Sequence, residues 1–323
     1  MRTTREVKAT VRVPASTSNL GGGFDCLGIA VDRWLAASVV VREAERARAV
    51  TIQRFGALAN LTHAAEEDLV HVGYTLACEV RRHPVPGNIN YEVSSTIPVA
   101  RGLGASAAAL VAGAFLARDS LGLDLTREDI AEICAQEEGH PDNAGPAVFG
   151  GAVLGVNGGD RAERRYAFSP LTVHPEIALV FAVPELEIAT SDARAVLPKS
   201  LPFTTAVAAI AKAAAIVEGL RTGDPRLLAY ALDDVVHVPF RRQLLPGYDS
   251  VVNAAVKAGA FGATLSGSGS TIVAVASKKT ASRVGAAMQT AWREMGKTAE
   301  IILGTEPVRS AVAKSTARKE KRK

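Results

Sequence analysis

A glycine-rich segment at residues 98–108 carries the residue types that bind phosphate. Gly102 and Gly104 allow a sharp turn and a close approach of the backbone to a ligand. An alanine-rich helical run follows at residues 105–118, so the glycines precede a helix N-terminus. Unpaired N–H groups and the positive end of the helix dipole favour an anion at that position. We therefore predict a phosphate-binding loop in which the hydroxyl of Ser106 contacts a phosphate oxygen or Mg²⁺.

The segment differs from two better-known nucleotide loops. No Gly-Lys-Ser/Thr follows the glycines, as a P-loop requires, and the third glycine of the dinucleotide fingerprint is missing. The glycines alone also fit a tight turn before a buried helix. The order Pro-x-x-x-Gly-Leu-Gly-x-Ser-Ala resembles the phosphate loop of the small-molecule kinases that include galactokinase, homoserine kinase and mevalonate kinase, although Ala105 replaces their usual serine. The resemblance implies ATP binding by Pro98, Arg101, Gly102, Leu103, Gly104, Ala105, Ser106 and Ala107.

A second small-residue loop occupies residues 14–28 and contains three consecutive glycines between Asn19 and Asp25. On composition alone it is a flexible hairpin connection. Its order is similar to the homoserine kinase pattern Pro-Ala-x-x-Ala-Asn-Leu-Gly-Pro-Gly-Phe-Asp-x-Leu-Gly, with Gly22 in place of a proline. The resemblance implies that Asn19 and Asp25 bind the substrate.

The segment Glu-Gly-His-Pro-Asp-Asn at residues 138–143 resembles a homoserine kinase segment in which a glutamate eight residues before the histidine binds Mg²⁺. Glu132 stands at that distance from His140, so the resemblance implies a metal site formed by Ser106 and Glu132. Without the resemblance, Glu132 fits a solvated surface carboxylate. His140 and Asn143 match residues that line the substrate pocket.

The C-terminal half contains two arginine segments of the same kind. Thr190 and Arg194 fit the family pattern Thr-x-x-x-Arg-x-x-Leu-Pro, and Arg241 fits Pro-Tyr-Arg-x-x-Leu-x-Pro-Gly with phenylalanine for tyrosine. A third glycine-rich loop at residues 262–271 resembles the motif that packs against the phosphate loop. The resemblance to the homoserine kinases therefore extends over residues 8–305, in segments that follow one another in the family order.

The chemistry that this resemblance implies is ATP-dependent phosphorylation of the side-chain hydroxyl of L-homoserine. A zwitterionic amino acid needs a carboxylate for its ammonium group, which Asp25 offers. It also needs a cation for its carboxylate, and Arg194 and Arg241 provide planar guanidinium groups. Asn19, His140, Asn143 and Thr190 are expected to orient the substrate. The residues expected to act in catalysis are Ser106, Glu132 and Asn143.

Two alternatives remain open at this point. A related kinase could act on another alcohol, such as mevalonate or a sugar, although the lysine and the aspartate expected of a mevalonate kinase are absent from the matching segments. A binding or regulatory protein could also use the fold after losing catalysis. Ala105 is the one residue that favours such a loss, and the retention of Ser106 and Glu132 argues against it.

Composition narrows the class of protein. The 323 residues are 48% apolar and 22% charged, and the net charge of +4 arises from a basic tail at residues 308–323. The rest of the chain is slightly acidic, which argues against nucleic-acid binding. The three cysteines, Cys26, Cys78 and Cys134, lack metal-ligand spacing and fit a reducing compartment. We predict a cytoplasmic location with no membrane partner, and a homodimer is an open expectation.

The predicted fold is α+β with two domains. The resemblance implies an N-terminal ATP-binding domain over residues 1–160, like the second domain of ribosomal protein S5, and a ferredoxin-like domain over residues 161–307. Residues 308–323 are predicted to be a disordered tail. Within the first domain, Thr126 followed by Asp129 predicts a capped helix over residues 127–138.

Overall fold

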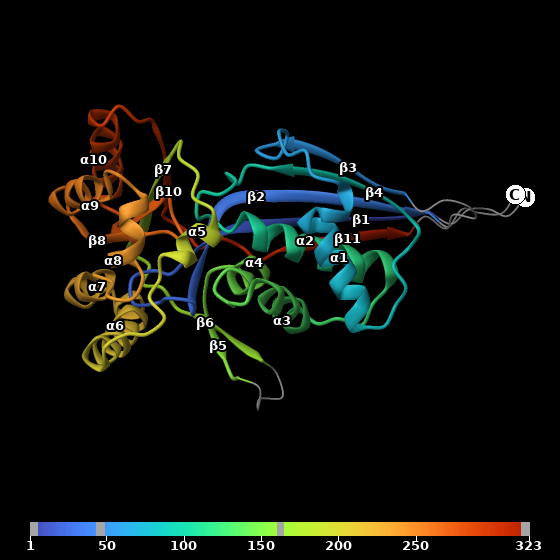
Figure 1. Cartoon of the computed structure of the whole chain (residues 1–323), viewed down its shortest axis with the longest axis horizontal. Coiled ribbons are helices and arrows are strands. Elements are labelled where there is room, and N and C mark those ends of the chain that lie inside the picture. Colours follow the sequence, from blue (N-terminus) through green and yellow to red (C-terminus); the bar gives the residue numbers. More distant parts are fainter. Residues whose placement is uncertain (1–5, 43–48, 160–164, 318–323) are drawn as a thin grey trace, which may run out of the picture.

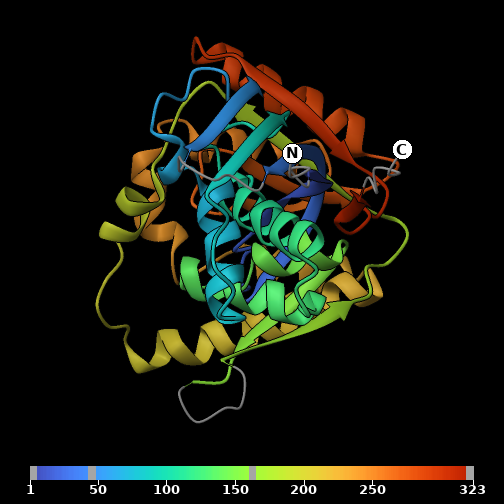
Figure 2. The same cartoon turned by 90° about the vertical axis from the view of Figure 1, so that its right-hand side faces the viewer.

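Two β-sheets packed against helices form the part of the chain that this computed structural model describes, residues 6–42, 49–159 and 165–317 (Figure 1). The N-terminal sheet has the order β11-β1-β2-β4-β3, and β5 and β6 extend it from β2. Its strands are β1 (Glu6–Ser18), β2 (Leu27–Arg42), β3 (Ala49–Gly56), β4 (Asn88–Ser95), β5 (Ala152–Asn157), β6 (Tyr166–Leu171) and β11 (Val312–Ala317). Figure 2 shows the helices of this half below β3 and β4 and above the paired strands β5 and β6. They are α1 (Leu69–Val80), α2 (Ala105–Leu121), α3 (Arg127–Glu138) and α4 (Ala144–Phe149), with a 3₁₀ turn at Ala65–Glu67.

The C-terminal sheet is antiparallel, with the order β10-β7-β9-β8. Its strands are β7 (Ile177–Pro184), β8 (Ala260–Leu265), β9 (Ile272–Ser277) and β10 (Ala299–Gly304). The helices of this half are α5 (Thr190–Ala195), α6 (Phe203–Thr222), α7 (Pro225–Leu232), α8 (Val238–Arg241), α9 (Tyr248–Lys257) and α10 (Ala281–Glu294), with a 3₁₀ turn at Arg242–Leu244. These two units of sheet and helix confirm the predicted two-domain α+β fold.

Helix α2 forms the centre of the N-terminal half and packs unusually closely against α1. Its sequence is rich in alanine, and most of its side chains are fully buried. A β-carbon at Gly113 of α2 would lie 1.9 Å from the carbonyl oxygen of Val70, and one at Gly73 of α1 would lie 2.1 Å from that of Leu110. Only glycine at both positions permits this spacing, which fixes the N-terminus of α2 relative to the sheet.

Helix α3 begins and ends where the sequence predicts. The Thr126 hydroxyl accepts a hydrogen bond from the Asp129 N–H, and the Asp129 carboxylate accepts one from the Thr126 N–H. This capping box satisfies two backbone donors at the start of the helix. Gly139 ends the helix with a left-handed φ of +82°. The residues that follow therefore turn back toward α2.

The prediction of a disordered tail is wrong for the residues of it that the structure describes. Strand β11 pairs antiparallel with β1, from Val312 opposite Arg12 to Ala317 opposite Val7. Ala311 is fully buried, and its carbonyl oxygen accepts a hydrogen bond from the Arg127 guanidinium. Strand pairing uses backbone groups, so a basic and weakly apolar segment can still complete a sheet edge. The predicted tail residues 318–323 lie outside the described part of the chain.

The predicted domain boundary at residue 160 lies outside the described residues, between β5 and β6. These two strands pair with each other, from Ala152 opposite Leu171 to Asn157 opposite Tyr166. The chain therefore leaves the N-terminal sheet after β6 and enters the C-terminal sheet at β7.

Candidate active site

A cavity of about 450 Å³ lies at the N-terminus of α2 and is lined by both halves of the chain. Residues 98–106 of the glycine-rich segment form one part of its wall. The predicted site residues that also line it are Asn19, His140, Asn143, Thr190, Arg194 and Arg241. The predicted site residues outside its lining are Asp25, Ala107 and Glu132. The structure thus gathers segments that are far apart in the sequence around one space.

The glycine-rich segment has the backbone conformation that its sequence predicts. Gly102 and Gly104 have φ angles of +71° and +66°, and α2 begins at Ala105 without a side-chain cap. A β-carbon at Gly102 would lie 2.1 Å from the carbonyl oxygen of Ser266, so a larger residue does not fit. The first turn of α2 therefore presents backbone N–H groups at the cavity wall, an arrangement suited to phosphate.

The third glycine-rich loop packs against the phosphate-loop segment, as the resemblance implies. The Ser266 hydroxyl donates to the carbonyl oxygen of Gly102 at 2.7 Å and lies 2.8 Å from the Thr17 hydroxyl. The Gly267 N–H donates to the carbonyl oxygen of Ser18. The end of β1, the phosphate-loop segment and the C-terminal half are therefore joined by hydrogen bonds behind the cavity.

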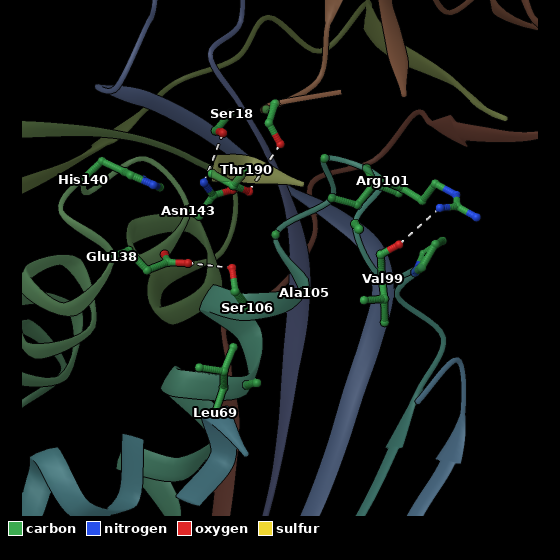
Figure 3. A pocket seen from close by; sticks show the side chains of 18 of the residues that line it. Ser18, Leu69, Val99, Arg101, Ala105, Ser106, Glu138, His140, Asn143 and Thr190 are labelled. Carbon is green, nitrogen blue, oxygen red and sulfur yellow. Dashed lines mark hydrogen bonds between the residues drawn. The ribbon is translucent and has the colours of Figure 1, made fainter. Parts of the chain in front are cut away.

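The carboxylate beside Ser106 belongs to Glu138. The Ser106 hydroxyl donates to Glu138 Oε1 at 2.7 Å, and both side chains point toward each other at the cavity wall (Figure 3). The second oxygen, Oε2, is buried and has no hydrogen-bond partner among the described residues. Burial raises the pKa of Glu138, against the opposing charge of His140 and the hydrogen bond from Ser106. An unpartnered, desolvated carboxylate oxygen is suited to a cation.

The prediction that Glu132 shares a metal site with Ser106 is wrong. Glu132 Oε1 accepts hydrogen bonds from the Arg165 N–H at 2.7 Å and from the Gln136 amide at 3.3 Å, outside the cavity lining. Glu132 and Glu138 are six residues apart on α3. Six residues turn an α-helix by about 600°, so the two side chains leave the helix about 120° apart. Only one of them can face Ser106.

The two predicted carboxylate-binding arginines have different surroundings. Arg194 makes a two-point ion pair with Asp25, with N–O distances of 2.9 and 3.2 Å. Arg241 is buried, and its Nε and Nη1 donate to the carbonyl oxygens of Ala193 and Gly267. Burial, together with the charge of Arg194, lowers the pKa of Arg241 to about 10, so the group stays charged at neutral pH.

Asn143 is the centre of a polar network at the floor of the cavity. Its Nδ2 donates to Ser18 Oγ at 3.1 Å (Figure 3). The same Nδ2 donates to Asp142 Oδ1 at 3.2 Å, and Asn143 Oδ1 accepts from the Ser16 hydroxyl at 2.9 Å. Asp142 is buried and lies 2.6 Å from Nδ1 of His140. Burial disfavours the imidazolium, but the hydrogen bond and charge of Asp142 outweigh it and raise the pKa of His140 to about 9. His140 is therefore a cation at neutral pH.

The opposite end of the cavity is apolar and ends at the start of α1. Leu58, Leu61 and Leu69 line it, beside Asp68. The Asp68 carboxylate accepts from the Val70 N–H as the cap of α1, and it forms an ion pair with Arg54 at 2.8 Å. These bonds occupy the carboxylate, so this end of the cavity offers mostly apolar contact.

Family models match both halves of the chain. The model of the GHMP kinase N-terminal domain matches residues 58–151, and that of the GHMP kinase C-terminal domain matches residues 216–294. Solved structures that share less than 25% of their residues with this chain have the same fold. One is a mevalonate kinase from L. major, with 17% identity and a TM-score of 0.62. Fold and site together define a kinase of the GHMP class.

Closer relatives narrow the class. A homoserine kinase from Trichormus variabilis is 38% identical over 89% of this chain and 92% of its own length, and one from Gloeobacter violaceus is 40% identical over 87% and 92%. The crystal structure of homoserine kinase from Cytophaga hutchinsonii covers 95% of this chain and 97% of its own, with 29% identity and a TM-score of 0.81. The chain belongs to the homoserine kinases of the GHMP kinase family.

Proposed function

We propose that this chain transfers the γ-phosphoryl group of ATP to the side-chain hydroxyl of L-homoserine, giving O-phospho-L-homoserine for threonine biosynthesis. Membership of the homoserine kinases supports the reaction. The observation that carries it is one cavity that joins a glycine-rich helix N-terminus to the guanidinium groups of Arg194 and Arg241. Arg194 is paired with the Asp25 carboxylate, which lies outside the cavity lining. The first part suits a triphosphate, and the second suits a small zwitterion.

ATP fits the cavity with its base at the apolar end and its phosphates at the glycine-rich end. The base would contact Leu58, Leu61 and Leu69, and the β- and γ-phosphates would accept from the first N–H groups of α2. Ala105 offers its backbone N–H and no hydroxyl. We therefore assign phosphate binding to the backbone of residues 102–106 and to the Ser106 side chain.

The residues present also fit Mg²⁺, which is bound as part of the nucleotide complex. Glu138 Oε2 is buried and has no hydrogen-bond partner in the part of the chain that the structure describes, and the Ser106 hydroxyl donates to the other oxygen of the same carboxylate. Oxygen donors of this kind suit Mg²⁺, which usually takes one or two carboxylates together with substrate phosphates. When bound, the ion would neutralise charge on the β- and γ-phosphates. We propose Ser106 and Glu138 as the protein residues that hold it.

Homoserine is proposed to bind at the ion pair between Asp25 and Arg194. The pair keeps both charges compensated before the substrate arrives. The substrate ammonium would then contact Asp25, while its carboxylate would accept from Arg194 and Arg241. The substrate ammonium replaces Arg194 as the partner of Asp25, and the substrate carboxylate replaces Asp25 as the partner of Arg194. No charge is therefore left unpaired when the substrate binds.

The substrate hydroxyl is proposed to lie between Asn143 and the γ-phosphate. His140, which is charged, would then donate to the transferred group and stabilise its negative charge. A loose phosphoryl-transfer transition state needs little negative charge on the nucleophile, so early deprotonation is not required. The proton can leave late, to a γ-phosphate oxygen, and no residue is assigned as a base.

An assay of ADP release across several alcohols tests the proposal. Homoserine, threonine, mevalonate and galactose are offered separately at equal concentration, with ATP and Mg²⁺. Homoserine should give the highest kcat/KM, and phosphohomoserine should form in equal amount to ADP. A higher kcat/KM for mevalonate or galactose would show that homoserine is not the preferred substrate. No turnover with any alcohol would favour a binding or regulatory role.

We further infer that a second copy of this chain covers the exposed face of α6. Phe203, Val207 and Ile210 lie at spacings of four and three residues on that face and are 83%, 51% and 71% exposed. Such spacing forms the contact seam of two packed helices.

Among the described helices, α6 is the one long and apolar enough to cross a membrane by length and composition. Lys212 of the same helix forms an ion pair with Asp233, which follows α7.

A cytoplasmic location and the absence of nucleic-acid partners stay predictions from composition.

A further inference from the structure

His237 lies behind the substrate end of the cavity, in the segment that enters α8. Its side chain is fully buried. The Asp234 carboxylate accepts hydrogen bonds from the backbone N–H groups of Val236, His237 and Val238. Three bonds to one oxygen fix the backbone at this turn, and the direction of the His237 ring is fixed with it.

The two nitrogens of the ring face two residues of the substrate site. Nε2 lies 3.2 Å from the carbonyl oxygen of Asn19, and Nδ1 lies 3.5 Å from Nη1 of Arg241. A carbonyl oxygen only accepts and a guanidinium only donates. The ring therefore fits one tautomer, with hydrogen on Nε2 and a free lone pair on Nδ1.

Phe24 packs against the face of the same ring. Its ring stacks on that of His237 with centroids 5.1 Å apart and an angle of 26° between the planes. The Arg241 guanidinium carbon lies 5.2 Å from the centroid of the Phe24 ring. Phe24 belongs to the loop between Asn19 and Asp25, so the histidine joins that loop to Arg241 by stacking as well as by hydrogen bonds.

The charge state agrees with this geometry. Burial, with the positive charge of Arg241, lowers the pKa of His237 to about 4, against Asp234, the Asn19 carbonyl and Asp25. The ring is therefore neutral at physiological pH. A protonated ring would place a second donor against the Arg241 guanidinium, so the contact needs the neutral form.

The other hydrogen bonds of the Arg241 guanidinium among the described residues go to backbone carbonyl oxygens. Its Nε donates to Ala193 O at 3.0 Å, and its Nη1 also donates to Gly267 O at 3.2 Å. Both acceptors are backbone groups, so His237 provides the one side-chain acceptor among the described contacts of Arg241. The Arg241 side chain is also part of the cavity lining. Its direction toward a substrate carboxylate therefore depends in part on the histidine.

We propose that His237 is a positioning residue for homoserine binding. It orients the Arg241 guanidinium and fixes the loop of Asn19 against α8. The inference rests on the proposed function, since it assigns Arg241 to the substrate carboxylate. His237 itself touches neither homoserine nor ATP in this arrangement, and it is not among the predicted site residues.

Three substitutions separate the two contacts of the ring. His237→Phe keeps the ring and its stacking on Phe24 and removes both hydrogen bonds. His237→Asn keeps an acceptor near the place of Nδ1, and His237→Gln keeps a donor near the place of Nε2. Homoserine KM should rise at least tenfold in the phenylalanine variant, with kcat reduced less than threefold and ATP KM unchanged. The asparagine variant should recover part of the homoserine KM.

A double-mutant cycle with Arg241→Leu tests whether the effect passes through the arginine. In the Arg241→Leu background, His237→Phe should raise homoserine KM by less than it does in the unchanged protein, because only the contact with the loop of Asn19 is left to lose. Circular dichroism and thermal melting identify any variant that fails to fold, and the asparagine and glutamine variants then replace the phenylalanine one.

Each outcome has a distinct meaning. A folded His237→Phe variant with normal homoserine KM contradicts the inference, as does an equal effect with and without Arg241. If the unchanged protein releases no ADP with homoserine, the proposed function fails instead. Homoserine binding measured by calorimetry in the presence of a non-hydrolysable ATP analogue then still tests the positioning role.

Discussion

Two glutamates of α3 form a matched pair for testing the metal site. Replacing Glu138 with glutamine keeps the hydrogen bond from Ser106 and removes the negative charge toward the cavity. We expect kcat to fall at least tenfold, about 1.4 kcal/mol of transition-state stabilisation, with partial recovery in excess Mg²⁺. Glu132→Gln should stay within twofold of the unchanged protein. Steady-state assays at saturating ATP and homoserine measure both, and a larger loss in the Glu132 variant would contradict the assignment.

Asp25 tests the absence of a catalytic base. Its ion pair with Arg194 assigns it to charge recognition. Asp25→Asn should therefore raise homoserine KM strongly and reduce kcat less, because the substrate ammonium loses its partner in the ground state and the transition state alike. The measurement is the separate dependence of rate on homoserine and on ATP. A collapse of kcat at saturating homoserine with an unchanged KM would make Asp25 the base.

The sequence predicted the residue types of the site better than their partners. Segment order located Asn19, His140, Asn143 and the arginines at one cavity, because each lies in a motif with its own signature. The carboxylate beside Ser106 was misassigned because a count along the chain ignores which face of a helix a side chain leaves. The pairing of Asp25 with Arg194 could not be predicted, since both had been matched to an absent substrate.

At the scale of elements, the contribution of β11 can be measured by truncation. Ending the chain after residue 311 removes β11 and leaves the edge of β1 unpaired along six residue pairs. We expect the melting temperature to fall by more than about 4 °C, since each lost kcal/mol costs a domain of 150–250 residues roughly 2–4 °C. Ending the chain after residue 317 is the matched control and should change it little. Equal melting temperatures for both truncated chains and the full chain would show that β11 adds no stability.

Elements with strong periodic or capping signals were predicted closely, and weak ones were missed. Helix α3 has the predicted bounds because its cap and its stop glycine are local. The sequence predicts a glycine-rich loop at residues 262–271, but residues 262–265 belong to β8, which is a strand because it pairs with β9. Strand β11 depends in the same way on β1, some 300 residues earlier in the chain. Such pairings between distant residues leave little trace in either segment alone.

At the scale of the whole molecule, the exposed face of α6 predicts self-association. Ile210→Glu places a charge in the centre of the apolar seam without touching the cavity lining. We expect the unchanged protein to sediment as a dimer and the variant as a monomer, with activity retained. Val156→Glu, at a half-exposed position on β5, is the control for an added charge elsewhere. A monomer before any substitution would exclude the second copy as the partner of α6.

Stability against pH reports on the buried segment that joins the two halves of the site. The pKa of His237 is lowered to about 4 by burial and by Arg241, against Asp234 and Asp25, whereas a free histidine titrates near 6.5. Between these values the unfolded chain binds a proton that the folded chain does not. The free energy of unfolding therefore decreases as the pH falls from about 6.5 toward 4.

His237→Gln removes this titrating group, so its free energy of unfolding should decrease less between about pH 7 and pH 4.5 than that of the unchanged protein. The variant is expected to be less stable at neutral pH, because it loses the stacking on Phe24. Urea unfolding at both pH values measures the two slopes. His83→Gln, at a residue that follows α1, controls for the loss of a histidine elsewhere and should keep the original slope. Parallel curves for the unchanged protein and His237→Gln would mean that this ring does not stay neutral in the folded chain, and the hydrogen bond from Arg241 would then need another acceptor.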